Sequence, residues 1–222
     1  MITGIDVSHW NGLIDWHKAA AAGDEFAYIK ATDGTGYVDS MLKENLATCP
    51  LPHGCYHFFR PELDAAKQAD LFIANVPKQT LPPAVDVEVN SASVSMNTFR
   101  NALQSFLASL EAHYGEIPVI YTRKYFWEPN LGKTGWASRY PLWVAHYTTA
   151  ADPLMPSDWT KWTIWQYSAN GNRRGAEFGA QSADIDIDRA VDGFVTPAPP
   201  PTGGVDRAKV LAAIALLQEA VA

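Results

Sequence analysis

The segment Pro83-Ala84-Val85-Asp86-Val87-Glu88-Val89 alternates apolar and acidic residues. This pattern predicts a short buried strand, in which residues two positions apart point to the same side. Asp86 and Glu88 therefore share one face, about 6.6 Å apart along the strand, and the valines form the other face. Two carboxylates this close are costly to bury unless they share a polar site. The alternative is a half-buried strand with a polar outer face, but the prolines at its start and the valines behind the acids favour burial on both sides.

Strands and helices alternate on both sides of this segment. Before residue 124, the predicted strands cover 2–8, 26–32, 54–59, 83–89 and 118–123. The predicted helices between them cover 15–22, 39–48, 63–76 and 95–114. Farther along, the pattern allows a short helix at 125–131 and then three strands joined by loops, at 141–147, 161–167 and 184–190.

Regular alternation of strands and helices predicts an α/β fold with a mostly parallel sheet. Eight strands with one rhythm suggest a closed barrel, and the helix-poor final third makes it an irregular TIM-like (β/α)5(β)3 barrel. An open doubly wound sheet is the alternative fold. No glycine-rich phosphate loop supports a nucleotide-binding version of that sheet.

The end of the chain has a different composition. We expect a catalytic barrel over 1–195, a linker rich in proline and glycine over 196–204, and a short C-terminal helix over 205–222. An apolar stripe marks this helix, formed by Val210, Leu211, Ile214, Leu217 and Val221. The helix could dock on the barrel, self-associate or be the beginning of a second module.

Composition excludes several classes of partner. The 222 residues carry a net charge of −7 and no Lys/Arg cluster, which argues against nucleic acid binding. No apolar run is long enough for membrane insertion. Because the first strand begins at Ile2, we expect no signal peptide, synthesis in the cytosol and export by another route. The spacing of Cys49 and Cys55 is neither a zinc nor a redox pattern, and free thiols are favoured over a bridge across a tight loop.

Acidic residues gather where a barrel would place its active site. In parallel barrels that site lies at the carboxyl ends of the strands. Asp86 and Glu88 end the fourth strand, Asp6 lies late in the first, and Asp186 belongs to the last. The first and last strands of a closed barrel are neighbours. We therefore expect three separated segments to deliver these four acids to one mouth.

Each acid also has an ordinary interpretation. Asp6 is a common type of turn former or helix cap. Asp184 reads as a loop residue, and Asp188 beside Arg189 reads as a surface ion pair or a cap. A metal site is the competing explanation for so many acids, but the calcium-loop spacing is absent, so no metal or other cofactor is predicted. A Ser–His–acid triad lacks its Gly-x-Ser-x-Gly turn.

Two carboxyls with different pKa values suit the hydrolysis of glycosidic bonds, where one donates a proton and the other is charged. Eight Trp and nine Tyr residues agree with a carbohydrate ligand, because aromatic rings form stacking platforms for sugars. By alternation along the strands, Tyr56, Tyr121 and Trp143 are the candidate sugar contacts. Core packing is the alternative for each of them.

Eight segments carry a resemblance to a known family. They are GIDVSHWNGLIDW (4–16), FAYIKATDGTGYVD (26–39), GCYHFFRP (54–61), PAVDVE (83–88), PVIYT (118–122), PLWVAHY (141–147), WQYS (165–168) and IDIDRAVDGF (185–194). In this order they resemble the family 25 glycoside hydrolases, the Chalaropsis-type lysozymes of phages, bacteria and fungi. The resemblance covers about residues 1–195, and the segments are highly specific only in combination.

The resemblance implies an irregular eight-stranded barrel with five helices. It also implies hydrolysis of the β-1,4 bond between N-acetylmuramic acid and N-acetylglucosamine in bacterial cell-wall peptidoglycan. Carried over from the family, Glu88 is the proton donor, and Asp86 stabilises positive charge near the sugar or orients its acetamido group. Asp6 and Asp186 complete the acidic cluster.

The mechanism that we expect needs a protonated Glu88, its pKa raised by Asp86 and by a partly dehydrated cleft. Asp86 would stay ionised and oppose the charge of the transition state. The attacking group is open between a carboxylate, a water molecule and the N-acetyl oxygen of the substrate. The last is favoured, because no separate nucleophile is evident in the sequence.

Other classes of function stay open at this point. A barrel that binds peptidoglycan without cutting it is the main alternative, and the presence of both acids of the pair argues against it. A chitinase-like enzyme would have a longer acidic DxxDxDxE strand. Wall cleavage without a signal peptide suggests a phage endolysin, held in the host cytoplasm until lysis and released to the cell wall through a hole made by another protein.

Overall fold

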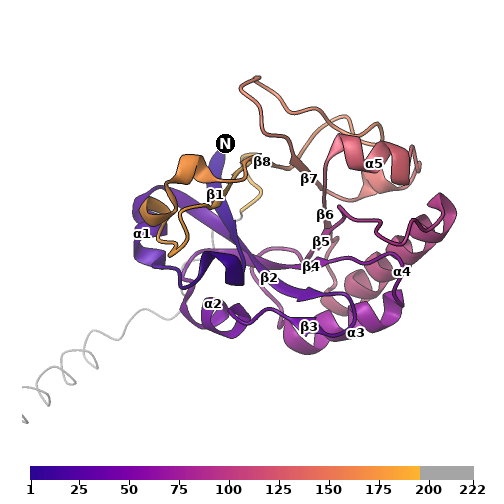
Figure 1. The fold of residues 1–222 in the computed structure, drawn as a ribbon, viewed down its shortest axis with the longest axis horizontal. Coiled ribbons are helices and arrows are strands. Elements are labelled where there is room, and N and C mark those ends of the chain that lie inside the picture. Colours follow the sequence, from indigo (N-terminus) through magenta and orange to yellow (C-terminus); the bar gives the residue numbers. More distant parts are fainter. Residues whose placement is uncertain (196–222) are drawn as a thin grey trace, which may run out of the picture.

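Residues 1–195 are described by a computed structural model, shown in Figure 1. The linker and the C-terminal helix expected over 196–222 lie outside the described residues. Eight strands form a closed barrel, because β1 pairs with β2 at one edge and with β9 at the other. These strands are β1 (Ile2–Val7), β2 (Asp24–Asp33), β4 (His53–Phe58), β5 (Ala84–Asp86), β6 (Val119–Thr122), β7 (Leu142–Ala145), β8 (Ile164–Ser168) and β9 (Asp186–Ala190).

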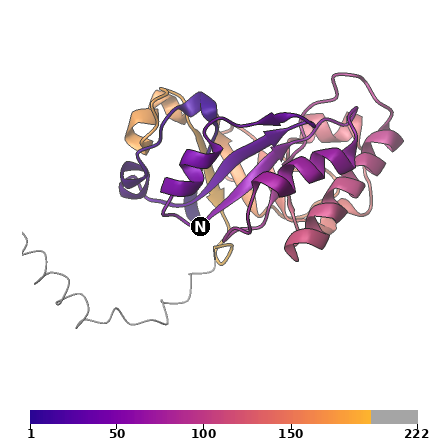
Figure 2. The same ribbon diagram turned by 90° about the horizontal axis from the view of Figure 1, so that it is seen from below.

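The five helices each connect two successive barrel strands in the first two thirds of the chain. They are α1 (Trp16–Ala21), α2 (Leu42–Thr48), α3 (Ala65–Asn75), α4 (Met96–Tyr114) and α5 (Lys124–Asn130). After β7 the connections contain only 3-10 turns, which confirms the predicted (β/α)5(β)3 barrel. Figures 1 and 2 show α3 and α4 side by side on the outside of the sheet.

Local sequence signals explain where these helices begin and end. The side chains of Asp15, Asp64 and Ser95 accept hydrogen bonds from the first free backbone N–H groups of α1, α3 and α4. Gly115 ends α4 in the left-handed conformation, with φ of 70°, which glycine adopts without strain. The predicted boundaries of the four long helices therefore agree with the observed ones to within a few residues.

Alternation along the strands separates two apolar layers. One layer fills the barrel, with Tyr28, Tyr56 and Trp143 among its members. The other lies between the sheet and the helices, where Phe72 and Phe106 pack against the outer faces of the strands. At one end of the barrel, polar side chains replace this inner apolar layer. The alternation of residues along the strands therefore places these polar side chains together.

The structure corrects two expectations about the strands. First, β9 runs antiparallel to both β1 and β8, so Asp186 lies at the beginning of its strand and not near its carboxyl end. Asp186 still reaches the predicted mouth, because it is the register partner of Asp6. Second, β5 ends at Asp86, and Glu88 follows it in extended chain held to β6 by the N–H of Val87, which donates to the carbonyl of Tyr121. A short strand, β3 (Tyr37–Val38), was not predicted and pairs with the end of β2.

The two cysteines are buried free thiols, which confirms the favoured interpretation. Burial raises the pKa of the Cys49 thiol to about 12. None of the helices within residues 1–195 has the length and apolar character needed to span a bilayer.

Candidate active site

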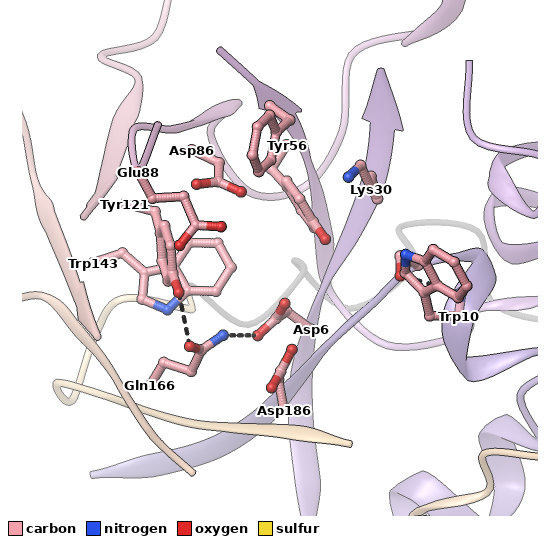
Figure 3. Close-up of a pocket in the computed structure, with 12 residues that line it drawn as sticks. Asp6, Trp10, Lys30, Tyr56, Asp86, Glu88, Tyr121, Trp143, Gln166 and Asp186 are labelled. Carbon is pink, nitrogen blue, oxygen red and sulfur yellow. Dashed lines mark hydrogen bonds between the residues drawn. The ribbon is translucent and has the colours of Figure 1, made fainter. Parts of the chain in front are cut away.

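A cleft of about 270 Å³ opens at the mouth of the barrel, as Figure 3 shows. All seven residues predicted from the sequence line it. The complete lining is Asp6, Ser8, Trp10, Lys30, Tyr56, Phe58, Asp86, Glu88, Tyr121, Trp143, Gln166 and Asp186. The site is therefore built from strand ends that are far apart in the sequence, as the barrel interpretation requires.

The four predicted acids come from three segments. Asp86 ends β5 and Glu88 lies two residues farther on, and both side chains reach the cleft. Asp6 and Asp186 face each other across the β1–β9 pair. Asp86 and Asp6 are buried, whereas Glu88 and Asp186 are partly exposed. Within residues 1–195, the buried Oδ1 atom of Asp86 has no hydrogen-bond partner, which leaves one acceptor of this carboxyl unsatisfied.

A hydrogen-bond network holds Asp6 in place. The amide Nε2 of Gln166 donates to Asp6 Oδ2 over 2.6 Å (Figure 3). The hydroxyls of Tyr121 and Tyr147 both donate to Gln166 Oε1, over 2.9 and 2.7 Å. In this arrangement the amide oxygen accepts from two hydroxyls, while the amide N–H faces a carboxylate that can only accept when ionised. Gln166 thus donates to Asp6.

Asp188 contradicts its predicted surface role. Its side chain is completely buried beneath the cleft, and its Oδ1 accepts a 2.8 Å hydrogen bond from the indole N–H of Trp143. Burial, together with the nearby Asp6, raises the pKa of Asp188 well above its ordinary value. Asp188 therefore holds its proton to higher pH than an ordinary aspartic acid does. Asp184, in contrast, is the exposed loop residue that was predicted, and it lies 3.5 Å from Arg173.

The carboxyls of the cleft hold protons to unusually high pH. Burial is the main cause for every one of them, and it raises the pKa of Asp6 to about 6 and that of Asp186 to about 9. Burial also raises the pKa of Glu88, and the positive charges of Arg123 and Lys30 lower it by a smaller amount. A proton donor is therefore available in this cleft at neutral pH.

Burial and a neighbouring charge both act on Asp86. Burial raises the pKa of Asp86 well above its ordinary value, and the charge of Glu88 raises it further. Ionisation of Glu88 therefore strengthens the hold of Asp86 on its proton.

The predicted aromatic residues form the floor of the cleft. Trp143 is 1% exposed, and its ring lies tilted against that of Tyr28 with 4.8 Å between centroids, while Tyr56 and Tyr121 pack edge-on against it. Their contact with a ligand is thus limited to ring edges and hydroxyls. The broad aromatic surface lies elsewhere, on Trp10, which is 78% exposed at the rim.

A capped turn presents Trp10. Ser8 Oγ accepts from the backbone N–H of Trp10 over 3.3 Å, and Asn11 Oδ1 accepts from the N–H of Ser8 over 2.8 Å. The ring of His9 lies tilted against that of Trp10 with 4.4 Å between centroids, and His9 Nδ1 lies 2.8 Å from Asp39 Oδ2. His9 therefore supports one side of the Trp10 ring, and the other side of that ring is open to solvent.

Sequence reasoning missed several residues of the site, chiefly Lys30, Gln166, Trp10 and Tyr147. Two of them carry a usable signal. Lys30 has the same parity as Tyr28 within its strand, and Gln166 is a polar residue between two aromatic residues. A polar side chain on the inner face of a barrel strand predicts a position at the mouth. Among the described residues, no group of three or more His, Cys, Asp or Glu side chains has a geometry that could hold a metal ion.

A mostly parallel barrel whose mouth holds coupled carboxyls in an aromatic cleft has the architecture of a glycoside hydrolase. The model of the family "Glycosyl hydrolases family 25" matches residues 5–176, and the chain belongs to this family. This family and its barrel are the ones that the sequence motifs indicated.

Similar proteins agree with this assignment. Lysozyme M1 of Streptomyces globisporus is 38% identical over 200 residues, which are 83% of this chain and 66% of that protein. The N,O-diacetylmuramidase of Chalaropsis sp is 30% identical, covering 75% of this chain and 88% of that one. The crystal structure of the bacterial lysozyme from Streptomyces coelicolor has a TM-score of 0.77 at 32% identity and covers 95% of this chain and 96% of that chain. The chain spans just under two thirds of the length of Lysozyme M1.

Proposed function

We propose that the protein is a peptidoglycan hydrolase that cleaves the β-1,4 bond between N-acetylmuramic acid and N-acetylglucosamine. The observation that carries this proposal is the coupled pair of Asp86 and Glu88 at the mouth of the barrel, with Asp6 and Asp186 opposite them. Membership of family 25 and the similarity to a lysozyme and to a muramidase support the choice of substrate.

Glu88 is the proton donor in this proposal. Its carboxyl is only partly buried and lines the cleft, so a glycosidic oxygen can reach it. Its raised pKa keeps the proton available. Transfer of that proton to the leaving oxygen breaks the bond while positive charge develops at the anomeric carbon.

Asp86 is the partner that becomes charged during the reaction. Positive charge at the sugar favours the ionised form of a nearby carboxyl, and Lys30 also lowers the pKa of Asp86. Asp86 lines the cleft, so its carboxyl is placed to accept the N–H of the substrate acetamido group. The acetamido oxygen would then attack the anomeric carbon, with substrate assistance in place of a protein nucleophile. A water molecule would open the resulting oxazolinium ring and give its proton to the Glu88 carboxylate, which restores the acid.

Comparison of the wild type with Glu88→Gln and Asp86→Asn tests these roles. Both replacements keep the shape of the side chain and remove its proton chemistry. Clearing of a suspension of purified bacterial walls should be lost in Glu88→Gln and strongly reduced in Asp86→Asn. Equal clearing by the wild type and Glu88→Gln would refute the assignment of the acid. Binding to walls without clearing by any of the three proteins would favour the non-catalytic binding barrel.

Two finer parts of the proposal need their own measurements. An endolysin should stay in the host cytoplasm until lysis, which fractionation of cells before and after lysis would test. Self-association through residues 205–222 predicts a larger species for the full chain than for residues 1–195 in sedimentation experiments.

A further inference from the structure

A second cavity adjoins the catalytic cleft on the side of Glu88. It has a volume of about 200 Å³ and lies between the start of α5 and the chain that follows β7. Arg123, Lys124 and Tyr125 line one side, and His146, Tyr147 and Leu154 line the other. Figure 1 shows α5 beside β6 and β7 on the barrel, with the long connection between β7 and β8 close to it.

Hydrogen bonds hold the walls of this cavity in position. The backbone N–H of Leu154 donates to His146 Nδ1 over 3.0 Å, and the N–H of His146 donates to the carbonyl of Gln166 over 3.1 Å. Farther along the same connection, the N–H and the hydroxyl of Ser157 both donate to the carboxylate of Glu128 in α5, over 2.7 and 3.1 Å. The cavity is therefore formed before any ligand binds.

Two residues join this cavity to the catalytic cleft. Tyr147 lines the cavity, and its hydroxyl donates to Gln166, which lines the cleft. Arg123 also lines the cavity, and its positive charge acts directly on Glu88. A substituent of a ligand that extends out of the cleft beside Glu88 would consequently lie in this cavity.

The chemistry of the cavity suits an anion with apolar parts. Tyr125 is 73% exposed and Tyr147 is 53% exposed, and Leu154 adds an open apolar side chain. Arg123 and Lys124 form no ion pair within residues 1–195, although Arg60, Arg139 and Arg174 all pair with carboxylates. Free cations beside the acidic cleft of a protein with net charge −7 favour an anionic ligand.

We propose that this cavity binds the peptide stem of the peptidoglycan strand, with Arg123 and Lys124 on its carboxylates and Tyr125, Tyr147 and Leu154 against its alkyl side chains. The inference rests on the proposed function, because it takes the substrate to be peptidoglycan. In the intact strand the lactyl carboxyl of each muramic acid is held in the amide bond to its stem, so the carboxylates lie on the stems, which are attached to every second sugar. A stem thus matches the cavity in charge and in apolar character.

Two substrates made from one wall preparation test the inference. One is soluble glycan that carries uncross-linked stems, and the other is the same glycan after an amidase has removed the stems. Each substrate is prepared in two forms, one before and one after an acid treatment that strips phosphate polymers from the glycan. New reducing ends give kcat/KM on each substrate, and the ratio of the two values measures stem recognition. We expect the wild type to prefer the stem-bearing glycan at least tenfold.

Variants of the cavity show which residues produce this preference for the stem-bearing glycan. Lys124→Gln and the double variant Lys124→Gln, Tyr125→Ala should lower the ratio several-fold, mainly by raising KM on the stem-bearing glycan. Lys67→Gln is the matched control, because Lys67 is an exposed lysine on the outer helix α3 and should leave the ratio unchanged. Far-ultraviolet circular dichroism and thermal unfolding verify that each variant is folded.

Three results would overturn the inference. The first is a wild type that cleaves both substrates equally well. The second is an unchanged ratio in Lys124→Gln and in the double variant. The third is a preference that disappears when the phosphate polymers are stripped, which would assign the cavity to phosphate. Cleavage of neither substrate by the wild type would instead refute the proposed function, and the inference with it.

Discussion

Asp24 provides a quantitative test of how burial controls the carboxyls of this protein. It is the first residue of β2 and pairs with Thr3 at the end of the barrel opposite the cleft. Its side chain is 3% exposed, and within residues 1–195 neither carboxylate oxygen has a hydrogen-bond partner. Burial alone raises the pKa of Asp24 from 3.8 to about 7. The change that we consider is Asp24→Asn, which keeps the shape and removes the titration.

The size of the effect follows from linkage. Below pH 3.8 the carboxyl is protonated in both the folded and the unfolded chain, and it costs nothing. As the pH rises toward 7, the unfolded chain releases the proton and the folded chain keeps it, so stability falls with rising pH. A difference of about 3 pH units at 1.36 kcal/mol each gives a loss of about 4 kcal/mol. In a domain of this size that corresponds to roughly 10 °C in Tm.

Thermal unfolding of the wild type and Asp24→Asn between pH 3.5 and pH 8 measures this loss. The asparagine amide is also buried without a partner, so its own cost is constant across the range. We expect the difference in Tm between the two proteins to shift in favour of Asp24→Asn as the pH rises, and to level off above pH 7. Two parallel curves would show that Asp24 ionises normally and would refute the reasoning.

Three further predictions concern the cleft. Gln166→Leu removes the hydrogen bond to Asp6 and should raise the pKa of Asp6 above its present value of about 6, as measured by NMR titration of carboxyl carbons; an unchanged pKa would contradict the network. Asp188→Asn should retain most of the activity, because an amide oxygen can accept from Trp143 as the protonated acid does. Asp188→Leu should lose both stability and activity. Similar losses in both variants would show that Asp188 acts as an anion. Trp10→Ala should raise KM by roughly 2- to 10-fold, as expected for the loss of about 0.5–1.5 kcal/mol of ring contact, with little change in kcat; an unaltered KM in steady-state kinetics would exclude Trp10 from the substrate path.

Much of the barrel can be predicted from the sequence because its parallel strands are buried on both faces. Such strands form continuous apolar runs, and any acid within them is conspicuous. Asp86 and Glu88 interrupt a run of valines, and strand alternation correctly assigns both to the inner face. The helices are equally predictable, because capping residues and a terminal glycine mark their ends.

The direction of the last strand could not be predicted in this way. Alternation has the same period in parallel and antiparallel strands, and β9 follows a loop that does not fix its direction. The same limit explains the error at Asp188. A residue beside Arg189 has an obvious surface interpretation, and only the closed barrel shows that Asp188 points inward, beneath Trp143.

The charge state of the central pair also lies beyond the sequence. Spacing indicates that Asp86 and Glu88 interact, but the burial of each carboxyl determines which one holds a proton more strongly. That burial depends on the packing of the floor residues, and the pKa values also depend on the charges of Lys30 and Arg123, which come from other segments of the chain. The role of an exposed aromatic residue such as Trp10 is equally hard to predict, because a turn of three residues is too short to show a periodic pattern.

The products released from purified peptidoglycan by the wild type and Glu88→Gln test the central claim most directly. Mass spectrometry of the fragments identifies the sugar at each new reducing end. We predict that the wild type releases fragments that end in N-acetylmuramic acid, and that Glu88→Gln releases them at a rate lower by about 10²- to 10⁴-fold, as expected for a missing general acid. Fragments that end in N-acetylglucosamine, or an undiminished rate in Glu88→Gln, would contradict the claim.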